Sequence, residues 1–136
     1  MSQAIAENGR APQTPPLPEK ASSNGKRPMP ESRTRFTVHV PSVLNDGSSV
    51  PAEVLDELQE HAVNTFGGYT LHPDLRGGWL DKNRHPFHEP IFKIEIEVAD
   101  RSQAILPLIA LASFIRQRLG QKAIFVTIED VGVVTI

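Results

Sequence analysis

The stretch from Phe92 to Val98 is the feature that most constrains how this chain can fold. Apolar and charged side chains alternate through it, with the apolar ones at Phe92, Ile94, Ile96 and Val98. A period of two residues is typical of a β-strand with one face buried and the other in water. Sheets with one solvated face are antiparallel or mixed, because purely parallel sheets are covered on both sides. We therefore expect an open sheet that helices cover on one face only.

A first helix is expected between Pro51 and Phe66. Apolar residues recur there at intervals of three and four, which places them in one stripe along a helix. Pro51 suits a helix start, where a missing N–H costs nothing. Gly67 and Gly68 follow, and glycine is the usual residue of a left-handed helix cap. The sequence therefore predicts that the helix ends at these two glycines.

A second helix is expected after Asp100, which together with Gln103 resembles a capping box. The segment that follows is apolar on nearly every side and closes at Gly120. Pro107 lies inside this segment and would remove one internal hydrogen bond. Either the first turn is kinked or the regular helix begins near Leu106, and the sequence leaves both alternatives open.

The other strands are marked by short alternating runs between turn residues. In chain order, we expect a strand over 35–40 that stops at Pro41, a strand over 69–72 and 76–80, a turn at 81–84, a return arm entered through Pro86 and Pro90, a last strand over 123–128, and a short further element within 131–136. The resulting order is β-α-β-β-α-β. This order predicts a ferredoxin-like α+β sandwich, an antiparallel sheet with two helices on one face.

The first 34 residues differ in composition from the rest. Six prolines stand there among small and charged residues, and almost no aliphatic side chain could be buried. Such a segment cannot offset the entropy of ordering it, so residues 1–34 are predicted to be a disordered tail and residues 35–136 a single domain. The run 14–18 suits a polyproline II conformation that could dock on a protein partner, although a plain spacer explains it as well.

Charge and composition exclude several classes of function. The part after the tail carries nine basic and thirteen acidic residues, a net charge of −4 that argues against binding DNA or RNA. No apolar run approaches the roughly 20 residues of a membrane span. The first ten residues lack the pattern of a secretory signal, so a cytoplasmic protein is expected. The chain has no cysteine, which removes disulfides, thiolate metal sites and thiol nucleophiles together.

One constellation is suggestive of a metal site. His85, His88 and Glu89 lie close together in sequence, and His72 on the preceding strand could approach them. Imidazole and carboxylate groups are ligands of zinc or nickel. Pro86 opposes a helix here, and on a strand two residues three apart point to opposite faces. The alternative is a polar hairpin whose histidines are exposed or hydrogen-bonded, in which case no cofactor is needed.

Aromatic residues near the same hairpin offer a second candidate. Tyr69, Trp79 and Phe87 could line a small ligand pocket at its base, since aromatic walls are common in such sites. Trp79 and Phe87 could equally pair across the two strands, as facing aromatic residues often do. The second interpretation is the simpler one.

The second helix is more apolar than a helix that covers one sheet face requires. Contacts within the domain are one explanation, and a subunit interface through Leu108, Leu111 and Ile115 is the other. The second explanation predicts a homo-oligomer.

Three short glycine motifs give the chain a resemblance to known sequences. Phe66 to Thr70, Gly77-Gly78-Trp79 and Leu119 to Lys122 resemble FGG-x-T, G-x-W and GQ-x motifs at comparable spacing in small bacterial proteins of unknown function. The resemblance spans roughly residues 36–128. It implies the ferredoxin-like fold, and it implies no activity or site residues.

The function that fits these observations best is a non-enzymatic, self-associating interaction or regulatory module. The alternative is a small metal- or ligand-dependent enzyme that uses the hairpin histidines. Convergence of these histidines in space would favour the enzyme.

Overall fold

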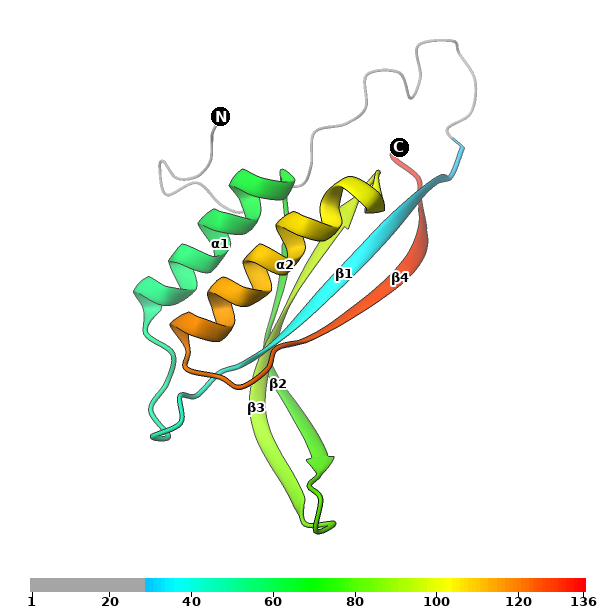
Figure 1. Ribbon diagram of the computed structural model, residues 1–136. Helices are drawn as coiled ribbons and strands as arrows, with labels where there is room; N and C mark the ends of the chain where they lie inside the picture. Colours follow the sequence, from blue (N-terminus) through cyan, green and yellow to red (C-terminus); the bar gives the residue numbers. More distant parts are fainter. Residues whose placement is uncertain (1–28) are drawn as a thin grey trace.

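The computed structural model describes residues 29–136, so most of the predicted tail lies outside the described part. In chain order the elements are β1 (Glu31–Pro41), α1 (Ala52–Phe66), β2 (Thr70–Leu80), β3 (Pro86–Val98), α2 (Arg101–Arg118) and β4 (Phe125–Val133). The strands form one antiparallel sheet in the order β2-β3-β1-β4. Both helices lie on the same face of this sheet (Figure 1). The predicted ferredoxin-like fold is confirmed.

The core lies between this face and the two helices. The central strands contribute alternate residues to it, because a side-chain period of two sends every second residue to the same face. The buried apolar residues of β1 and β3 are Phe36, Val38, Val40, Phe92, Ile94 and Ile96, and those of α1 and α2 are Val54, Leu58, Ala62, Ala104, Leu108, Leu111 and Ile115. We call the opposite, helix-free side of the sheet the open face.

The first and last strands are longer than the sequence predicted. β1 begins at Glu31 rather than Arg35, because its first residues pair with the end of β4, as in the pair Glu31 and Val133. The expected separate element within 131–136 is therefore wrong: residues up to Val133 continue β4. Residues 31–34 contain no apolar side chain, so their strand structure depends on this pairing and not on a local pattern.

Both helix ends follow their sequence signals. Gly67 caps α1 in the left-handed conformation, with φ 88°, and its N–H donates to the Val63 carbonyl. Asp100 caps α2, and its carboxylate accepts hydrogen bonds from the backbone N–H groups of Ser102 and Gln103. α2 therefore begins at once after Asp100 with Pro107 inside it. Within residues 29–136, neither helix is long and apolar enough to cross a membrane.

β2 and β3 form a long hairpin that extends beyond the ends of the helices (Figure 1). β2 is one strand with a shift of register between His72 and Leu75. β1 ends at Pro41, opposite Ile91, and the N–H of Ser42 just after it donates to the Pro90 carbonyl, so the part of β3 before Pro90 pairs with β2 alone. Because one of its edges is free there, Pro86 does not interrupt the strand.

Candidate functional site

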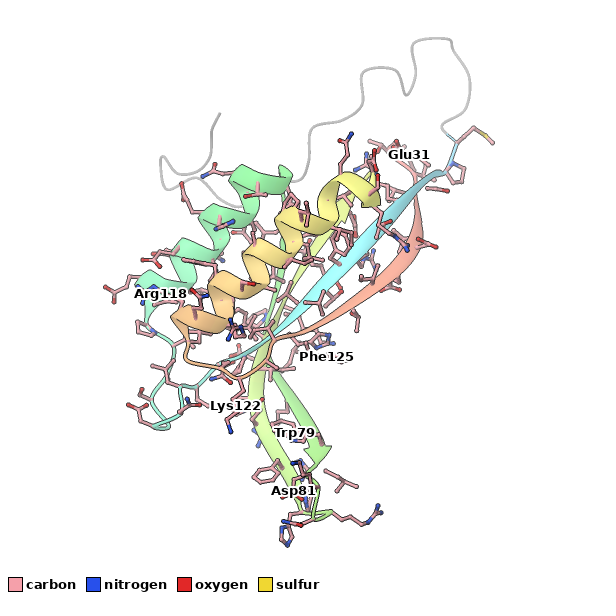
Figure 2. All side chains as sticks on the ribbon, in the orientation of Figure 1. Glu31, Trp79, Asp81, Arg118, Lys122 and Phe125 are labelled. Carbon is pink, nitrogen blue, oxygen red and sulfur yellow. The ribbon has the colours of Figure 1, made fainter. Side chains whose placement is uncertain are left out.

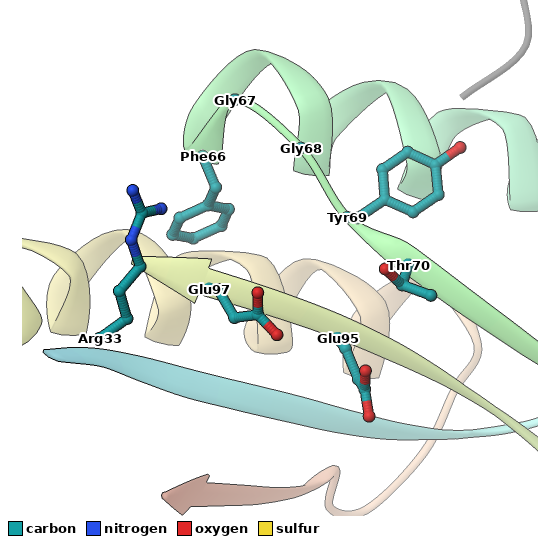
Figure 3. A pocket seen from close by; sticks show the side chains of 8 residues that line it. All are labelled: Arg33, Phe66, Gly67, Gly68, Tyr69, Thr70, Glu95 and Glu97. Atoms are coloured by element: carbon teal, nitrogen blue, oxygen red, sulfur yellow. The ribbon is translucent and has the colours of Figure 1, made fainter. Parts of the chain in front are cut away.

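A pocket lies where β2 separates from β3. The two strands begin to pair at Thr70 and Glu95, whereas β3 continues to Val98. The turn that joins α1 to β2 leaves a space of about 270 Å³ beside this unpaired end of β3 (Figure 3). The pocket is lined by Arg33, Phe66, Gly67, Gly68, Tyr69, Thr70, Glu95 and Glu97. The left-handed cap at Gly67 therefore ends the helix and also forms one wall of the pocket.

Two carboxylates give the pocket its acidic side. Glu97 accepts a hydrogen bond from Arg35 Nε at 2.8 Å, and this contact raises the pKa of the arginine. Glu95 Oε1 lies 3.1 Å from His72 Nε2. Arg33, the cation that lines the pocket, is 3.2 Å from the carboxylate of Glu31. Both arginines therefore have a carboxylate beside them, while Glu95 has a histidine as its neighbour.

The two aromatic residues of the pocket are placed differently: the ring of Phe66 lies beside the space, whereas the ring of Tyr69 is directed toward α1 (Figure 3). Phe66 ends α1, and its ring lies between the glycine turn and β3 (Figure 3). Tyr69 is half-buried against the core, and burial raises the pKa of its phenol, with Asp56 and Glu60 acting in the same direction. The phenol therefore keeps its proton, and can donate a hydrogen bond, at neutral pH. Flat apolar surface opposite hydrogen-bonding groups is the usual make-up of a small-molecule site.

The residues of the predicted metal site do not come together. His72 lies beside Glu95 at the base of the hairpin, and His85 lies in the turn, with Nδ1 3.7 Å from Asp81 Oδ2. His88 and Glu89 are neighbours on β3, opposite Gly78 and Gly77. Within residues 29–136 no three histidine and acidic side chains are placed to hold one metal ion. The enzyme based on these histidines thus lacks the convergence that would favour it.

The predicted aromatic pocket is divided between two places. Tyr69 lines the pocket described above, whereas Trp79 and Phe87 pair across the hairpin. Their ring centroids are 5.8 Å apart and their planes are 18° from parallel. Trp79 lies in the hairpin well below the helices, close to the turn that contains Asp81 (Figure 2). Cross-strand pairing of the two rings is therefore the interpretation that the geometry supports.

The predicted interface residues of α2 point into the core and not toward solvent. Leu108, Leu111 and Ile115 are buried in the core of the chain itself, so they cannot contact another subunit. The exposed apolar residues of α2 are instead Leu106 and Ile109. The sequence could not separate the two sets, because the helix is apolar on almost every side and lacks a single stripe.

Most residues of the pocket were missed by the sequence analysis. Arg33 fell in the predicted tail, Phe66 was assigned to the core stripe of the first helix, and Glu95 and Glu97 were treated as a solvated strand face. The Gly67-Gly68 pair was the one local sequence signal of the pocket, since two glycines after a helix predict a sharp turn at that place. The pocket itself depends on where β2 starts to pair with β3, which no local pattern shows.

Comparison with known proteins identifies the fold and goes no further. No protein-family model matches the chain, and no curated protein matches it. A phage SAM lyase in complex with S-methyl-5′-thioadenosine is similar in structure, with a TM-score of 0.55, 15% identity, and coverage of 84% of this chain and 92% of the lyase. The GlnK–ATP complex of B. subtilis gives a TM-score of 0.51 at 15% identity, covering 76% and 84% of the two chains. The divalent cation tolerance protein CutA1 of Thermus thermophilus gives 0.50 at 8% identity, covering 71% and 82%.

Proposed function

We propose that this protein is a self-associating regulatory module that joins copies of itself through the β2–β3 hairpin. The observation that carries the proposal is the stacked pair Trp79 and Phe87, residues that are 50% and 47% exposed. Leu80, the next residue of β2, is also exposed and points to the opposite face of the hairpin. Clustered large apolar side chains on a surface are typical of protein contact sites. Tryptophan in particular is enriched where interfaces draw most of their binding energy.

A second copy of the chain is the partner that fits this surface best. Both edges of the sheet are open in residues 29–136, and both carry exposed apolar side chains: Trp79 and Leu80 on β2, Phe125 and Ile128 on β4. Open edges of similar character are templates for pairing between chains. The open face also carries charges of both signs in close pairs, such as Arg35 with Glu97. A surface of balanced charge can meet its own copy without net repulsion.

Small-molecule control of this assembly is the regulatory part of the proposal. Two of the structurally similar proteins are described as complexes with adenosine compounds, S-methyl-5′-thioadenosine and ATP. These proteins share only the fold with this chain, so their ligands serve only as compounds to test in binding experiments. The pocket beside Glu95 is the place where we propose that a small molecule binds. A cytoplasmic location, expected from the sequence, belongs to the same proposal.

Light scattering coupled to size exclusion on the full chain tests the proposal. The wild type is expected to have a molar mass above that of the 15.0 kDa chain. This molar mass is expected to increase with protein concentration. The double variant Trp79→Ser/Phe87→Ser is expected to elute as a monomer, and far-UV circular dichroism checks that its helices remain folded. Leu106→Ser is the matched control, since it removes an exposed apolar side chain from α2 instead of the hairpin.

Two outcomes would contradict this assignment. A monomeric wild type at every concentration would end the proposal of self-association. Loss of assembly in Leu106→Ser, with the hairpin variant unaffected, would move the interface to α2.

A further inference from the structure

We propose that the open face of the sheet packs against the open face of a second copy, with Glu89 of each copy against Lys93 of the other. The inference deepens the proposed function and rests on it, because the stacked rings of the hairpin lie on this same face. It is carried by the side chains that share the open face, by two charges without an ion-pair partner, and by the glycine opposite one of them.

One continuous surface joins the stacked rings to the centre of the sheet. Paired residues of antiparallel strands project to the same side of a sheet. From the hairpin toward the helices, the open face therefore carries the pairs Trp79 and Phe87, Gly77 and Glu89, Leu75 and Ile91, and His72 and Lys93. Pro41 of β1 lies beside Ile91 on this face. Neither helix covers these side chains, since both helices lie on the other side of the sheet (Figure 1).

Glu89 and Lys93 have no ion-pair partner within residues 29–136, although both are half-buried. Lys93 lies between His72 and His39 on the neighbouring strands. Burial and the charge of Lys93 lower the pKa of His39, so this histidine is largely neutral at pH 7. Glu95, the next carboxylate along β3, lies 3.1 Å from His72. A half-buried charge is screened less by solvent than an exposed one, so each of the two gains from a counter-charge on a second copy.

A two-fold axis that crosses β3 at Ile91 brings both charge pairs together. Glu89 and Lys93 lie on either side of Ile91 on the same face, each about 6–7 Å from it at the usual rise of a strand. In a two-fold dimer each contact occurs twice, because residue i of one copy meets residue j of the other and j meets i. Rotation about an axis between the two open faces thus places Glu89 of each copy against Lys93 of the other. Leu75 and Ile91 then meet their own copies at the centre.

Gly77 leaves room for the incoming lysine. It is paired with Glu89, and a Cβ added to it would lie 3.5 Å from the Ile91 side chain, which shows that this position faces the same side. Because glycine has no side chain, the open face is lower here than at the stacked rings or at Leu75. Lysine has a long apolar stem with the charge at its end, so it can pass over Gly77 along Ile91 and reach Glu89.

The stacked rings contribute to the same contact. Phe87 lies four residues before Ile91, so the rotation places it against Glu95 of the second copy, and Trp79 against Thr70 of the second copy. The rings bury their apolar surface there, and the indole N–H of Trp79 can donate a hydrogen bond to the carboxylate of Glu95. The hairpin of each copy is therefore supported by the sheet of the other.

Charge reversal tests the contact, by light scattering on the full chain over a dilution series. The wild type is expected to reach twice the 15.0 kDa of one chain. Lys93→Glu and Glu89→Lys are each expected to weaken association at least about tenfold, because like charges then meet at both contacts. The double variant Lys93→Glu/Glu89→Lys is expected to recover the association of the wild type. Glu60→Lys is the matched control, since it reverses an exposed charge on α1, on the other side of the sheet.

An equimolar mixture of the two single variants tests the two-fold symmetry. Lys93→Glu carries two acidic side chains at the contact and Glu89→Lys carries two basic ones, so a mixed dimer has opposite charges at both places. The mixture is expected to associate as well as the wild type, although neither variant does so alone. Far-UV circular dichroism shows that each variant is folded, and recovery in the mixture excludes misfolding as the cause of the loss.

The possible results separate this inference from the proposed function. A monomeric wild type ends the proposal of self-association and this inference with it. Assembly that is lost in Trp79→Ser/Phe87→Ser and unchanged in both charge reversals refutes only the face-to-face contact. An effect of Glu60→Lys equal to that of Glu89→Lys, or a double variant that does not recover, refutes the pairing of Glu89 with Lys93. A molar mass of three or more chains at saturation, or a mixture that stays dissociated, refutes the two-fold axis.

Discussion

Leu111 lies at the centre of the core, with none of its surface exposed, and Leu106 on the same helix is 75% exposed. Removing a buried leucine side chain leaves a cavity, so Leu111→Ala should lower the free energy of unfolding by about 2–5 kcal/mol. Leu106→Ala should change it by less than about 0.5 kcal/mol, as is usual for an exposed position. Urea unfolding followed by far-UV circular dichroism measures both changes. Similar losses in the two variants would mean that α2 is rotated from the orientation described here.

A comparison of β3 with α2 shows which buried residues could be predicted from the sequence and which could not. The alternation at Ile94 and Ile96 predicted correctly which β3 side chains are buried, because a strand has two faces and only one was apolar. In α2, leucine stands at 106, 108 and 111, and apolar neighbours surround each of them. The rotation of this helix is therefore set by its packing on β1 and α1, and not by a local pattern.

At the scale of elements, α2 contains an unfavourable residue. Pro107 lacks the N–H that would donate to the Gln103 carbonyl four residues earlier, while the cap at Asp100 holds the first turn in place. Pro107→Ala should therefore raise the free energy of unfolding, by up to about 3 kcal/mol, the difference between proline and alanine in a helix interior. Chemical denaturation provides the measurement.

Pro107→Gly is the control for this change. It restores the same N–H but adds the low helix propensity of glycine, about 1 kcal/mol below alanine, so it should stabilise the protein less than Pro107→Ala. If both variants were less stable than the wild type, the proline would be required for packing and the helix would gain nothing from the restored hydrogen bond.

The order of elements was predictable, and the pocket was not, for a physical reason. Gly67, Gly68 and Asp100 act within a few residues of their own positions, so their turn and cap could be recognised locally. The pocket arises because the pairing of β2 with β3 stops at Thr70 and Glu95, residues 25 positions apart in sequence. Register of this kind is fixed by the whole sheet, and it determines which carboxylates line the pocket.

At the scale of the whole molecule, the sheet is unevenly supported. Its upper part is covered by both helices, while the hairpin extends beyond them and keeps only the contacts between its own strands (Figure 1). An isolated two-stranded hairpin is marginally stable in water. The stacked rings of Trp79 and Phe87 hold it together across the strands, and a second copy would add the surface that the chain itself does not provide.

Amide hydrogen exchange should reveal this uneven support. The buried part of β1, residues 36–40, lies between β3 and β4 and should exchange only through global unfolding. The hairpin amides at 77–88 should exchange by local opening in dilute protein, several orders of magnitude faster than those of β1. At concentrations where copies associate through Trp79 and Phe87, exchange in the hairpin should slow while exchange in β1 stays the same. Trp79→Ser/Phe87→Ser should abolish this concentration dependence. A hairpin equally protected at every concentration would show that it is stable by itself, and the exposed rings would then need no partner to explain them.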